Sequence, residues 1–375
     1  MSKRVAIVLL NWNTRDYLKR FLPGIISTAG KRDEVIVADN GSTDGSQELV
    51  ANDFPSVRLL AFERNYGFTG GYNRAFDLLR QDGFRYYLLL NTDIEVPYGW
   101  IEPLVEHMES NPDCGACGPK LHSYFERDKF EYAGAAGGLV DSLGFPFCRG
   151  RVLNTVERDS GQYDDAGELL WVSGAAFLTR SELYHRFGGL DNRFFAHMEE
   201  IDLCWRLQLA GYSVELEPKS TVYHIGGGTL PQKSPKKLFM NYRNNLLLLH
   251  KNLAKSIALD CFNKDFETIR KDREKALRYI EKLPSKACRK AFFTIFTRKV
   301  IDGAAALLYL LSGRFEYFKS VYKAHAEAKK LLENSDPKKE TSDYLLEKVF
   351  EKALKGEKIT VKGRDKGLVI FKKRL

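Results

Sequence analysis

The chain has 375 residues, of which 44% are hydrophobic and 29% are charged, and its formal net charge is +9. These proportions are ordinary for a globular protein and exclude an intrinsically disordered chain. No apolar run reaches the roughly 18 residues that a membrane-spanning helix needs. The nearest candidate, residues 291–312, is interrupted by Arg298, Lys299 and Asp302.

The two ends of the chain differ in charge. Residues 1–230 hold 23 Lys and Arg against 32 Asp and Glu, whereas residues 231–375 hold 35 against 17. A basic C-terminal region predicts an anionic partner, such as lipid headgroups or a polyanionic glycan. Nucleic acid has the same charge, but no nucleic-acid-binding motif accompanies these residues, and we expect no such partner. The sequence does not indicate an oligomeric state.

The N-terminal residues Met-Ser-Lys-Arg lead directly into an apolar run, without the apolar core and cleavage site of a secretory signal. We therefore expect a cytoplasmic protein that could attach to the inner face of the cytoplasmic membrane. Cys114 and Cys117 have the spacing of a redox or zinc motif, but no second pair completes a zinc site. We interpret the cysteines as small core residues of a reduced protein.

The first third of the chain alternates short apolar runs with amphipathic stretches. The apolar runs predict strands that are buried on both faces, and the stretches at 17–26 and 75–80 have helical spacing. This alternation predicts a mostly parallel sheet flanked by helices, which binds ligands at the carboxyl ends of its strands. The predicted strands are residues 5–10, 34–38, 57–62 and 86–90.

Later segments have a different character. Residues 120–170 are rich in Gly, Asp and aromatic residues and predict a loop-and-hairpin insert over the ligand cleft. A strand within 169–179 and an amphipathic helix at 199–210 follow. Beyond Pro231 the pattern is Lys-rich and helical, and breaks are expected near Pro284, Gly313 and residues 334–337.

Polar residues follow the first two predicted strands. Asn11 and Asn13 come after the first strand, and Asp39, Asn40 and Ser42 come after the second. A carboxylate at a strand end can accept hydrogen bonds from a base N–H and a ribose hydroxyl, which makes Asp39 a candidate nucleotide contact. The alternative is an Asx-turn followed by a helix cap.

A glycine-rich segment spans residues 64–73. Gly67, Gly70 and Gly71 would allow a ligand to approach the backbone closely, just before a helix whose N-terminus favours anions. A glycine run of this kind is weak by itself.

Oxygen-bearing side chains follow the fourth predicted strand. A divalent cation that bridges two phosphates needs one or two protein oxygens as anchors, and Asp93 offers a charged oxygen and Asn91 a neutral one. His224 ends a later strand before Gly226 and could bind the same cation or a diphosphate. The alternatives are a strand-end turn and a structural histidine.

Three carboxylates open the predicted helix at 199–210. The helix dipole favours Glu199, Glu200 and Asp202 in the first turn, so capping could account for them. Their crowding disfavours charging all three at once, which can raise one pKa towards that of a working general base.

Together these segments resemble the family 2 glycosyltransferases, which have the GT-A fold, and most of all the rhamnosyltransferase-like branch that builds bacterial cell-surface polysaccharides. The resemblance covers about residues 5–250. One motif would be weak, but eight occur in the family's order. They are LLNWN (9–13), VADNGSTDGS (37–46), RNYGFTGGYNRA (64–75), LLLNTD (88–93), CGPKL (117–121), VSGAAFLTR (172–180), FGGLDNRFFAHMEEIDLCWRLQLAGY (187–212) and VYHIGGGT (222–229).

The resemblance implies an inverting transfer of a sugar from a nucleotide-diphosphate donor, with dTDP-rhamnose or a UDP-hexose favoured, to a lipid-linked glycan acceptor. Mn²⁺ or Mg²⁺ is the implied cofactor. Asp39 would contact the donor base, Asn91 and Asp93 occupy the metal-binding DxD position, and His224 sits where many members place a metal or diphosphate ligand. The remaining donor-side residues would be Asn11, Asn13, Asn40, Ser42, Asn65, Gly67, Gly71, Asn73 and Thr92.

The chain departs from the family at the catalytic base. The family has a Glu-Asp pair whose Asp is the usual base, and Glu199-Glu200 stands there in this chain. Glu200 is therefore our prediction for the base, and Asp202 is the alternative. Tyr72 stands where many members have Asn, which bears on donor selectivity. The implied acceptor-side residues are Gly174, Trp205 and Arg206.

We divide the chain into three parts. Residues 1–230 would form the GT-A catalytic domain, with a donor half at 1–119 and an acceptor half at 120–230. Residues 231–335 would form a basic helical region, and residues 336–375 a Lys-rich tail with a small hairpin. A non-catalytic glycan-binding or scaffold protein on a degenerate GT-A fold is the alternative. A Rossmann dehydrogenase is disfavoured because no GxGxxG follows the first strand.

Within the basic region, residues 299–332 place apolar side chains among Lys and Arg at helical spacing. This pattern predicts a helix lying in a membrane interface, with further cations on an anionic leaflet. The alternative is that this face packs onto the catalytic domain or a second subunit. The apolar residues are Val300, Ile301, Ala304, Leu307, Leu308, Leu311, Phe315, Phe318, Val321 and Tyr322, and the cations are Lys286, Arg289, Lys290, Arg298 and Lys299.

Overall fold

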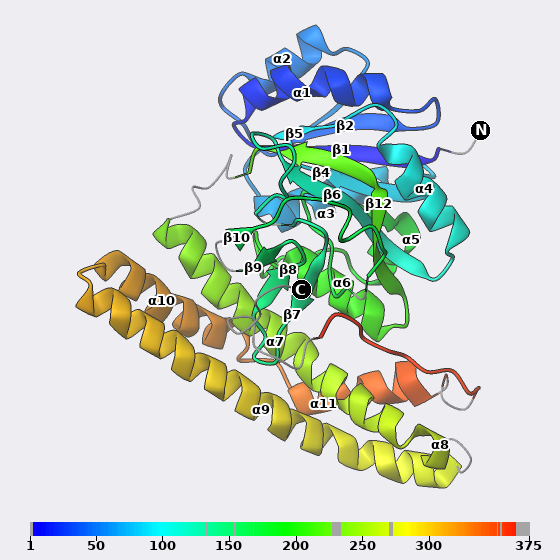
Figure 1. Cartoon of the computed structure of the whole chain (residues 1–375), viewed down its shortest axis with the longest axis vertical. Coiled ribbons are helices and arrows are strands. Elements are labelled where there is room, and N and C mark those ends of the chain that lie inside the picture. The colour runs from blue at the N-terminus through cyan, green and yellow to red at the C-terminus, as the bar shows by residue number, and fades with distance from the viewer. Residues whose placement is uncertain are drawn as a thin grey trace.

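An eight-stranded sheet forms the centre of the N-terminal body (Figure 1). The computed structural model of the chain describes residues 3–364, apart from 133, 153–154, 168, 227–233, 270–272, 351 and 353–354. The strands follow the order β3-β2-β1-β4-β11-β6-β12-β5. Their bounds are β1 Val5–Asn11, β2 Glu34–Asp39, β3 Arg58–Ala61, β4 Tyr86–Leu90, β5 Ile94–Glu95, β6 Cys114–Ser123, β11 Ala176–Arg180 and β12 Ser213–His224.

Most of these strands run in the same direction. β3, β2, β1 and β4 pair in parallel, as do β6 and β12. β11 pairs antiparallel with both β4 and β6, and β5 pairs antiparallel with β12. Only β11 and β5 are therefore reversed within the described sheet, which confirms the predicted mostly parallel sheet and its four predicted N-terminal strands.

Helices cover both faces of this sheet, because its strands are apolar at successive residues and successive side chains point to opposite faces. Along β1, Ile7 and Leu9 pack towards α1, α2 and α4, whereas Ala6 and Val8 belong to the core formed with α3, α5 and α6. Figure 1 shows α1 and α2 above the sheet and α6 below it. The helices are α1 Arg15–Thr28, α2 Ser46–Asp53, α3 Gly67–Leu79, α4 Ile101–Ser110, α5 Ser181–Arg186 and α6 Glu199–Leu209.

A small second sheet fills the predicted insert. Its strands form antiparallel hairpins in the order β10-β9-β8-β7, as the loop-and-hairpin prediction requires. A bridge between Gly138 and Trp171 joins it to the segment before β11. The strands are β7 Gly138–Val140, β8 Pro146–Cys148, β9 Arg151–Val152 and β10 Thr155–Val156.

The basic region is helical and packs onto the body. Leu246–Leu249 of α7 are buried in the same core as α6, and the indole of Trp205 donates to Ser256 Oγ across this contact at 2.6 Å. α7, α9 and α10 pack against one another, and α9 lies farthest from the sheet (Figure 1). The elements are α7 Pro235–Lys264, α8 Phe266–Ile269, α9 Arg273–Leu311, α10 Phe315–Leu331, α11 Pro337–Tyr344 and the π-helical turn η1 Leu345–Phe350.

The structure tests the predicted helix breaks and the predicted C-terminal hairpin. The break near Pro284 is wrong, because α9 continues through it with Ile280, Leu283 and Ala287 buried on either side. An interior proline destabilises a helix by about 3 kcal/mol. Burial of the large side chains Ile280 and Leu283 stabilises the fold by about 1.5–3 kcal/mol each, which offsets that cost. The breaks near Gly313 and 334–337 are confirmed. The C-terminal hairpin is absent from 355–364, and 365–375 lie outside the described residues.

Replacing Pro284 by Ala should stabilise the protein. The substitution restores a backbone N–H donor inside α9 and removes the clash of the ring with the preceding turn, which together stabilise the folded state by about 3 kcal/mol. The unfolded chain also gains conformational freedom, which reduces this stabilisation by about 1 kcal/mol. We expect the free energy of unfolding in urea to rise by about 2 kcal/mol. A fall in the unfolding midpoint would mean that the packing of the buried Pro284 ring outweighs the restored hydrogen bond.

Candidate active site

The carboxyl ends of β1 and β2 meet, as the sequence predicts. Asn11 lies opposite Asp39 in the parallel register, and its side-chain Nδ2 donates to Asp39 Oδ2 at 2.7 Å. Asp39 Oδ1 accepts from the Ser42 N–H at 2.9 Å and from Gln47 Nε2 at 2.7 Å. A carboxylate has about four acceptor positions, so Asp39 closes an Asx-type turn and keeps one position uncommitted, while its side chain is fully buried beneath the loop.

Side chains also connect the strand-end loops to one another. Asn13 has a positive φ of 53°, its N–H donates to Ser42 Oγ at 3.0 Å, and its Oδ1 accepts from the Thr43 N–H at 2.8 Å. Thr14 Oγ1 donates to Asn11 Oδ1 at 2.6 Å and lies 2.9 Å from Thr92 Oγ1. The sequence analysis missed Thr14 and Gln47, whose roles depend on contacts between loops.

The glycine-rich segment makes its close approaches to protein groups. Gly67 has a φ of +76°, and a Cβ there would lie 2.5 Å from the Phe195 ring. A Cβ on Gly71 would lie 2.6 Å from a methyl group of Leu10. The side chain of Asn40 is occupied by this segment, because its Nδ2 donates to Gly67 O at 3.0 Å and to Asn65 Oδ1 at 3.1 Å. These residues shape the donor side rather than leaving a gap over the backbone.

Two further residues of α3 are structural. Asn73 Oδ1 accepts from Tyr184 Oη at 2.7 Å, and its Nδ2 donates to Leu190 O at 2.7 Å, so its amide holds the segment after α5. Tyr72 is fully buried, and its hydroxyl lies 3.2 Å from Leu90 O, one residue before Asn91. In this arrangement neither side chain is available to contact a nucleotide-sugar.

The three predicted metal ligands converge at the end of β4. His224 Nε2 lies 3.1 Å from Asp93 Oδ1 and 3.4 Å from Asn91 Nδ2, because β12 and β5 pair with His224 opposite Ile94. His224 Nδ1 faces Glu131 Oε2 at 3.7 Å from the other side. Glu131 was not predicted, since it comes from the weakly patterned insert.

Charge pairing sets the protonation of this group. Burial would lower the pKa of His224, but Asp93 and Glu131 outweigh it and raise that pKa to about 10. Burial would raise the pKa of Asp93, whereas the bond from His224 lowers it. Without a cation, the site therefore holds a histidinium between two buried carboxylates.

The turn Ser173–Ala175 joins this group to the first turn of α6. Ala175 O accepts from the Asn91 N–H at 2.9 Å. On the neighbouring residue, a Cβ added to Gly174 would lie 3.5 Å from Glu200 Cβ. Gly174 was predicted on the acceptor side, and the structure places it between the DxD position and the predicted base.

Two of the three α6 carboxylates each have a buried oxygen that lacks a partner among the described residues, although Glu199 is buried as a whole and Glu200 is half-buried. Oε2 of Glu199 and Oε2 of Glu200 have no hydrogen-bond partner within the described part of the chain. Burial raises the pKa of Glu200 to about 7. Burial, and then the charge of Glu200, hold the pKa of Glu199 well above its usual range. Near neutral pH, Glu200 can therefore exchange a proton.

Asp202 is a poor candidate for the base. Its Oδ2 accepts from Arg206 Nε and Lys251 Nζ, both at 2.8 Å, and its Oδ1 accepts from Asn252 Nδ2 at 2.9 Å. Burial would raise its pKa, but Arg206 and Lys251 lower it. A fully buried carboxylate held by two cations has little affinity for a proton, so the structure argues against this alternative.

Two predicted acceptor-side residues are also part of the framework. Trp205 is fully buried and bonds to α7, so it cannot line an acceptor site in this structure. Arg206 uses its guanidinium on Asp202, Phe187 O at 2.6 Å and Gly189 O at 2.8 Å. The amphipathic pattern of α6 predicted its helical form, but it could not distinguish side chains that face the cleft from those that face α7.

The backbone turn that precedes Glu199 is strained and is held by α7. Phe195, His197 and Met198 have φ values of 64°, 72° and 70°, which are unfavourable for residues other than Gly. Asn244 Nδ2 lies 3.0, 2.7 and 2.7 Å from the carbonyl oxygens of Phe194, Ala196 and His197. Arg243 Nη2 donates to the same Phe194 oxygen at 2.7 Å. The helical region thus orients the turn that leads into Glu199 and Glu200.

A second possible ligand group lies away from this edge. His107 Nε2 is 2.8 Å from Glu215 Oε2, and its Nδ1 is 3.1 Å from Glu217 Oε2. Burial raises the pKa of the adjacent Cys114 thiol to about 12, so it stays protonated at neutral pH. Cys114 and Cys117 are free, buried core residues of β6, as expected.

Comparison with known proteins agrees with this geometry. Residues 6–184 match the family described as "Glycosyl transferase family 2". The chain carries a family 2 glycosyltransferase domain. The match ends before α6, so the assignments of Glu199 and Glu200 rest on the structure and stay predictions. The family and the enzyme class indicated by the sequence motifs are confirmed.

Relatives of this glycosyltransferase act in glycan synthesis. The N-acetylglucosaminyl-diphospho-decaprenol L-rhamnosyltransferase of Mycobacterium tuberculosis H37Rv is 26% identical over 264 residues, covering 66% of this chain and 85% of the relative. Rhamnosyltransferase WbbL of Escherichia coli K12 is 24% identical over 231 residues, covering 59% and 83%. The structure of GalNAc-T7 with UDP, GalNAc and Mn²⁺ has a TM-score of 0.51 at 15% identity over 74% of this chain and 52% of that one, a similarity of fold alone.

Asn244→Ala should slow turnover while leaving donor affinity near that of wild type. Loss of the amide removes this donor from the carbonyl oxygens of Ala196 and His197, while Phe194 O keeps its bond from Arg243. The strained turn can then relax, which displaces Glu200. The matched control is Asn245→Ala, a neighbouring buried Asn that donates to Gly144 O at 2.7 Å, away from the turn. Both variants should lose about 1–3 kcal/mol of stability, but only Asn244→Ala should lower kcat, by at least tenfold. Equal kcat in the two variants would contradict a positioning role.

Proposed function

We propose that the protein transfers a sugar, with inversion, from a nucleoside-diphosphate donor to a glycan carried on a lipid. The observation that carries this proposal is the pair of groups on either side of Gly174. The acidic turn at Asn91–Asp93 lies on one side, and Glu200, with a pKa of about 7, lies on the other. A cation-binding turn next to a proton acceptor is what a single displacement at an anomeric carbon requires.

The residues at the end of β4 fit a divalent cation. Asp93 offers a carboxylate and His224 an imidazole, with Asp93 Oδ1 3.1 Å from His224 Nε2. Asn91 faces His224 with its Nδ2 at 3.4 Å, so its amide would turn over to offer its oxygen to a cation. Such mixed oxygen and nitrogen sets suit Mn²⁺, and the oxygens also suit Mg²⁺. A bound cation would supply positive charge to the leaving diphosphate. To bind it through Nε2, His224 must first release its proton.

Each residue at this edge then has a defined part. Asp39 and the surrounding loop amides hold the nucleoside, with one acceptor position of the carboxylate left for the ligand. Glu200 removes the proton from the acceptor hydroxyl. As it does so, the hydroxyl oxygen attacks the anomeric carbon and the bond from that carbon to the diphosphate breaks. One displacement inverts the configuration. Glu199, buried beside it and protonated, keeps a second negative charge from forming there.

The relatives support a narrower version of the proposal. Both are named as rhamnosyltransferases, and the name of one describes an acceptor carried on a decaprenyl diphosphate. We therefore propose a dTDP-rhamnose donor, with a UDP-hexose as the alternative, and a polyprenyl-linked acceptor reached from the cytoplasm. Incubation with a panel of nucleotide sugars and Mn²⁺, followed by assay for slow hydrolysis, would identify the donor. No turnover of any donor would favour the scaffold alternative.

Turnover should depend on the charge of Glu200. Because its raised pKa of about 7 leaves it protonated at lower pH, kcat should rise as pH increases through about 7 and then level off. Glu200→Gln should cut kcat by roughly 10²–10⁴ and remove this pH dependence, with donor affinity unchanged. The matched control is Asp202→Asn, which should act through lost stability. If Asp202→Asn alone shows the catalytic profile, the assignment of the base is wrong.

Cation binding should release a proton from His224. Since its pKa of about 10 keeps it charged at neutral pH, Mn²⁺ affinity should increase with pH, and calorimetry in buffers of different ionisation enthalpy should detect the released proton. Asp93→Ala should abolish cation binding and transfer. Binding without proton release would assign His224 to the diphosphate instead, and full activity in EDTA would refute the metal.

A further inference from the structure

The outer surface of α9 carries a long row of exposed apolar side chains. Phe292 is 62% exposed, Phe296 55%, Val300 57%, Leu308 67% and Leu311 75%. Residues three or four apart share one side of a helix, and these residues therefore form a continuous stripe. At 1.5 Å per residue it is roughly 28 Å long. Large exposed apolar patches of this kind mark an interaction surface.

The opposite side of α9 packs against the other helices of the region. Leu283, Ala287, Ala291, Ile295 and Ala306 are buried there, against the other helices of the region. α9 is the outermost element in Figure 1, with the bundle on one side of it only. Most of the predicted apolar face therefore does not pack onto the catalytic domain in this structure, and the other form of that alternative, packing onto a second subunit, is an outcome of the test below. Val321 is the exception and is buried.

The charge of this surface is one-sided. Between Lys282 and Phe315 the sequence contains a single carboxylate, Asp302, which is 2% exposed and bonded to Arg298 at 2.8 Å. No ion pair within the described residues neutralises the exposed cations of this stretch. They are Lys282, Lys286, Arg289, Lys290, Lys299 and Arg314. At 100° per residue, the first four lie on the same side of α9 as the apolar stripe, just before it.

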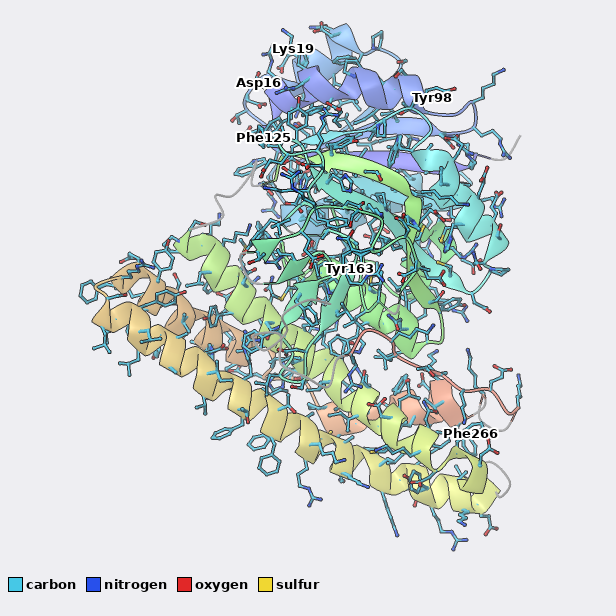
Figure 2. All side chains as sticks on the ribbon, viewed as in Figure 1. Asp16, Lys19, Tyr98, Phe125, Tyr163 and Phe266 are labelled. Atoms are coloured by element: carbon cyan, nitrogen blue, oxygen red, sulfur yellow. The ribbon has the colours of Figure 1, made fainter. Side chains whose placement is uncertain are left out.

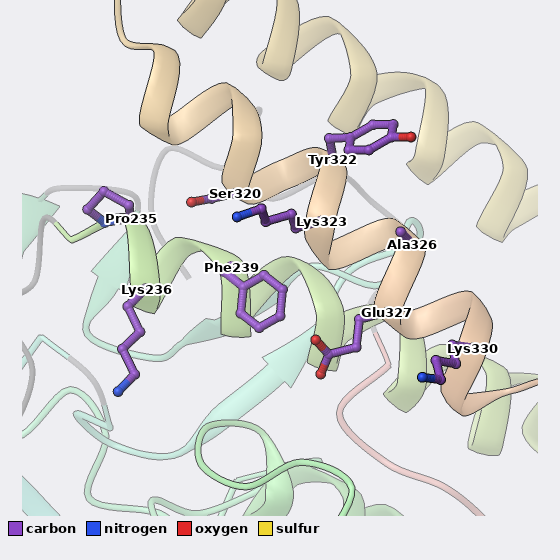
Figure 3. A pocket seen from close by; sticks show the side chains of 9 residues that line it. All are labelled: Pro235, Lys236, Phe239, Ser320, Tyr322, Lys323, Ala326, Glu327 and Lys330. Carbon is purple, nitrogen blue, oxygen red and sulfur yellow. The ribbon is translucent and has the colours of Figure 1, made fainter.

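A groove of about 660 Å³ lies between the start of α7 and α10, in the same helical region (Figure 3). Three lysines line it together with two aromatic rings, and Tyr322 belongs to both the groove and the exposed apolar residues. Glu327, the acid of the groove, is paired with Arg243. Lys237, next to the groove residue Lys236, lies within electrostatic range of Glu131 and thus near the catalytic edge. The lysines are Lys236, Lys323 and Lys330, and the rings are Phe239 and Tyr322.

We infer that the outer face of α9, with α10 beside it, seats the protein on an anionic lipid surface. Apolar rings and chains enter the boundary between headgroups and acyl chains, while the unpaired cations contact lipid phosphates. The positive charge of this face favours an anionic membrane over a second copy of the chain as its partner, because two copies of the face would bring like charges together. No helix among the described residues is long and apolar enough to cross a bilayer. This inference goes beyond the proposed transfer and is tested without any sugar donor.

The test is co-sedimentation of the full chain with vesicles of phosphatidylcholine, alone or mixed with phosphatidylglycerol, at low and high salt. Wild type should bind the anionic vesicles and lose at least tenfold in affinity at high salt or on neutral vesicles. Point variants suit this test better than truncation at 285, which would cut α9 and expose its buried side. Equal binding to neutral vesicles, or none to anionic ones, would overturn the inference.

Two sets of substitutions separate the apolar and charged contributions. Phe292→Ser with Phe296→Ser and Leu308→Ser should reduce binding at least tenfold, as should Lys286→Glu with Arg289→Glu and Lys290→Glu. The control is Tyr98→Ser, which removes a ring that is 93% exposed on the body, away from α9 in Figure 2, and it should bind like wild type. Circular dichroism checks that each variant folds.

Two further measurements decide the remaining cases. Asp93→Ala should bind vesicles like wild type, so failure of the proposed transfer and failure of membrane binding are distinguishable. Analytical ultracentrifugation should find no self-association that the Phe292, Phe296 and Leu308 substitutions abolish. If those substitutions split a dimer while leaving vesicle binding unchanged, the face belongs to a second copy and the inference is rejected.

Discussion

The active site depends on one contact between the two regions of the chain, the clamp of Asn244 and Arg243 on the turn before α6. Three residues of that turn have positive φ values without being glycine, at a cost of about 1–3 kcal/mol each, and the amide of Asn244 bonds to three of its carbonyl groups. The turn fixes where α6 starts and therefore where Glu199 and Glu200 lie. The basic helices therefore position the two carboxylates that we propose act in catalysis.

Environment then distinguishes carboxylates that share one helical turn. Asp202 faces α7, where Lys251, Arg206 and Asn252 hold it ionised, and it fastens the helices together. Glu200 faces the Gly174 turn and has no such partner, so burial raises its pKa into the working range. Across that turn, Asp93 and Glu131 do the reverse for His224 and keep it charged. Two oppositely tuned groups therefore flank one short segment of backbone.

The helical region also presents an exposed apolar and basic surface on α9. α9 is apolar on both sides, with one side packed in the bundle and the other exposed. Asp302 and Arg298, the polar pair that interrupts the long apolar run, are buried on the inner side and bonded to each other. Neutralising that charge internally leaves an outer surface of cations and apolar groups. The same pair keeps the helix from resembling a membrane span.

The sequence by itself determined the four N-terminal strands, the mostly parallel sheet and the strand-end loops, because apolar periodicity and turn chemistry are local. Eight ordered motifs also determined the family. Only the tertiary structure decided which polar residues face a ligand. Asn40, Asn73 and Arg206 carry suitable groups, but neighbouring loops occupy them. Glu131 and Asn244 were missed because each acts on a residue roughly 50 or more positions away in the chain. The proposal of Glu200 over Asp202 as the base, and the exposed side of α9, depend on packing, since burial depends on which elements meet, and no local pattern encodes that.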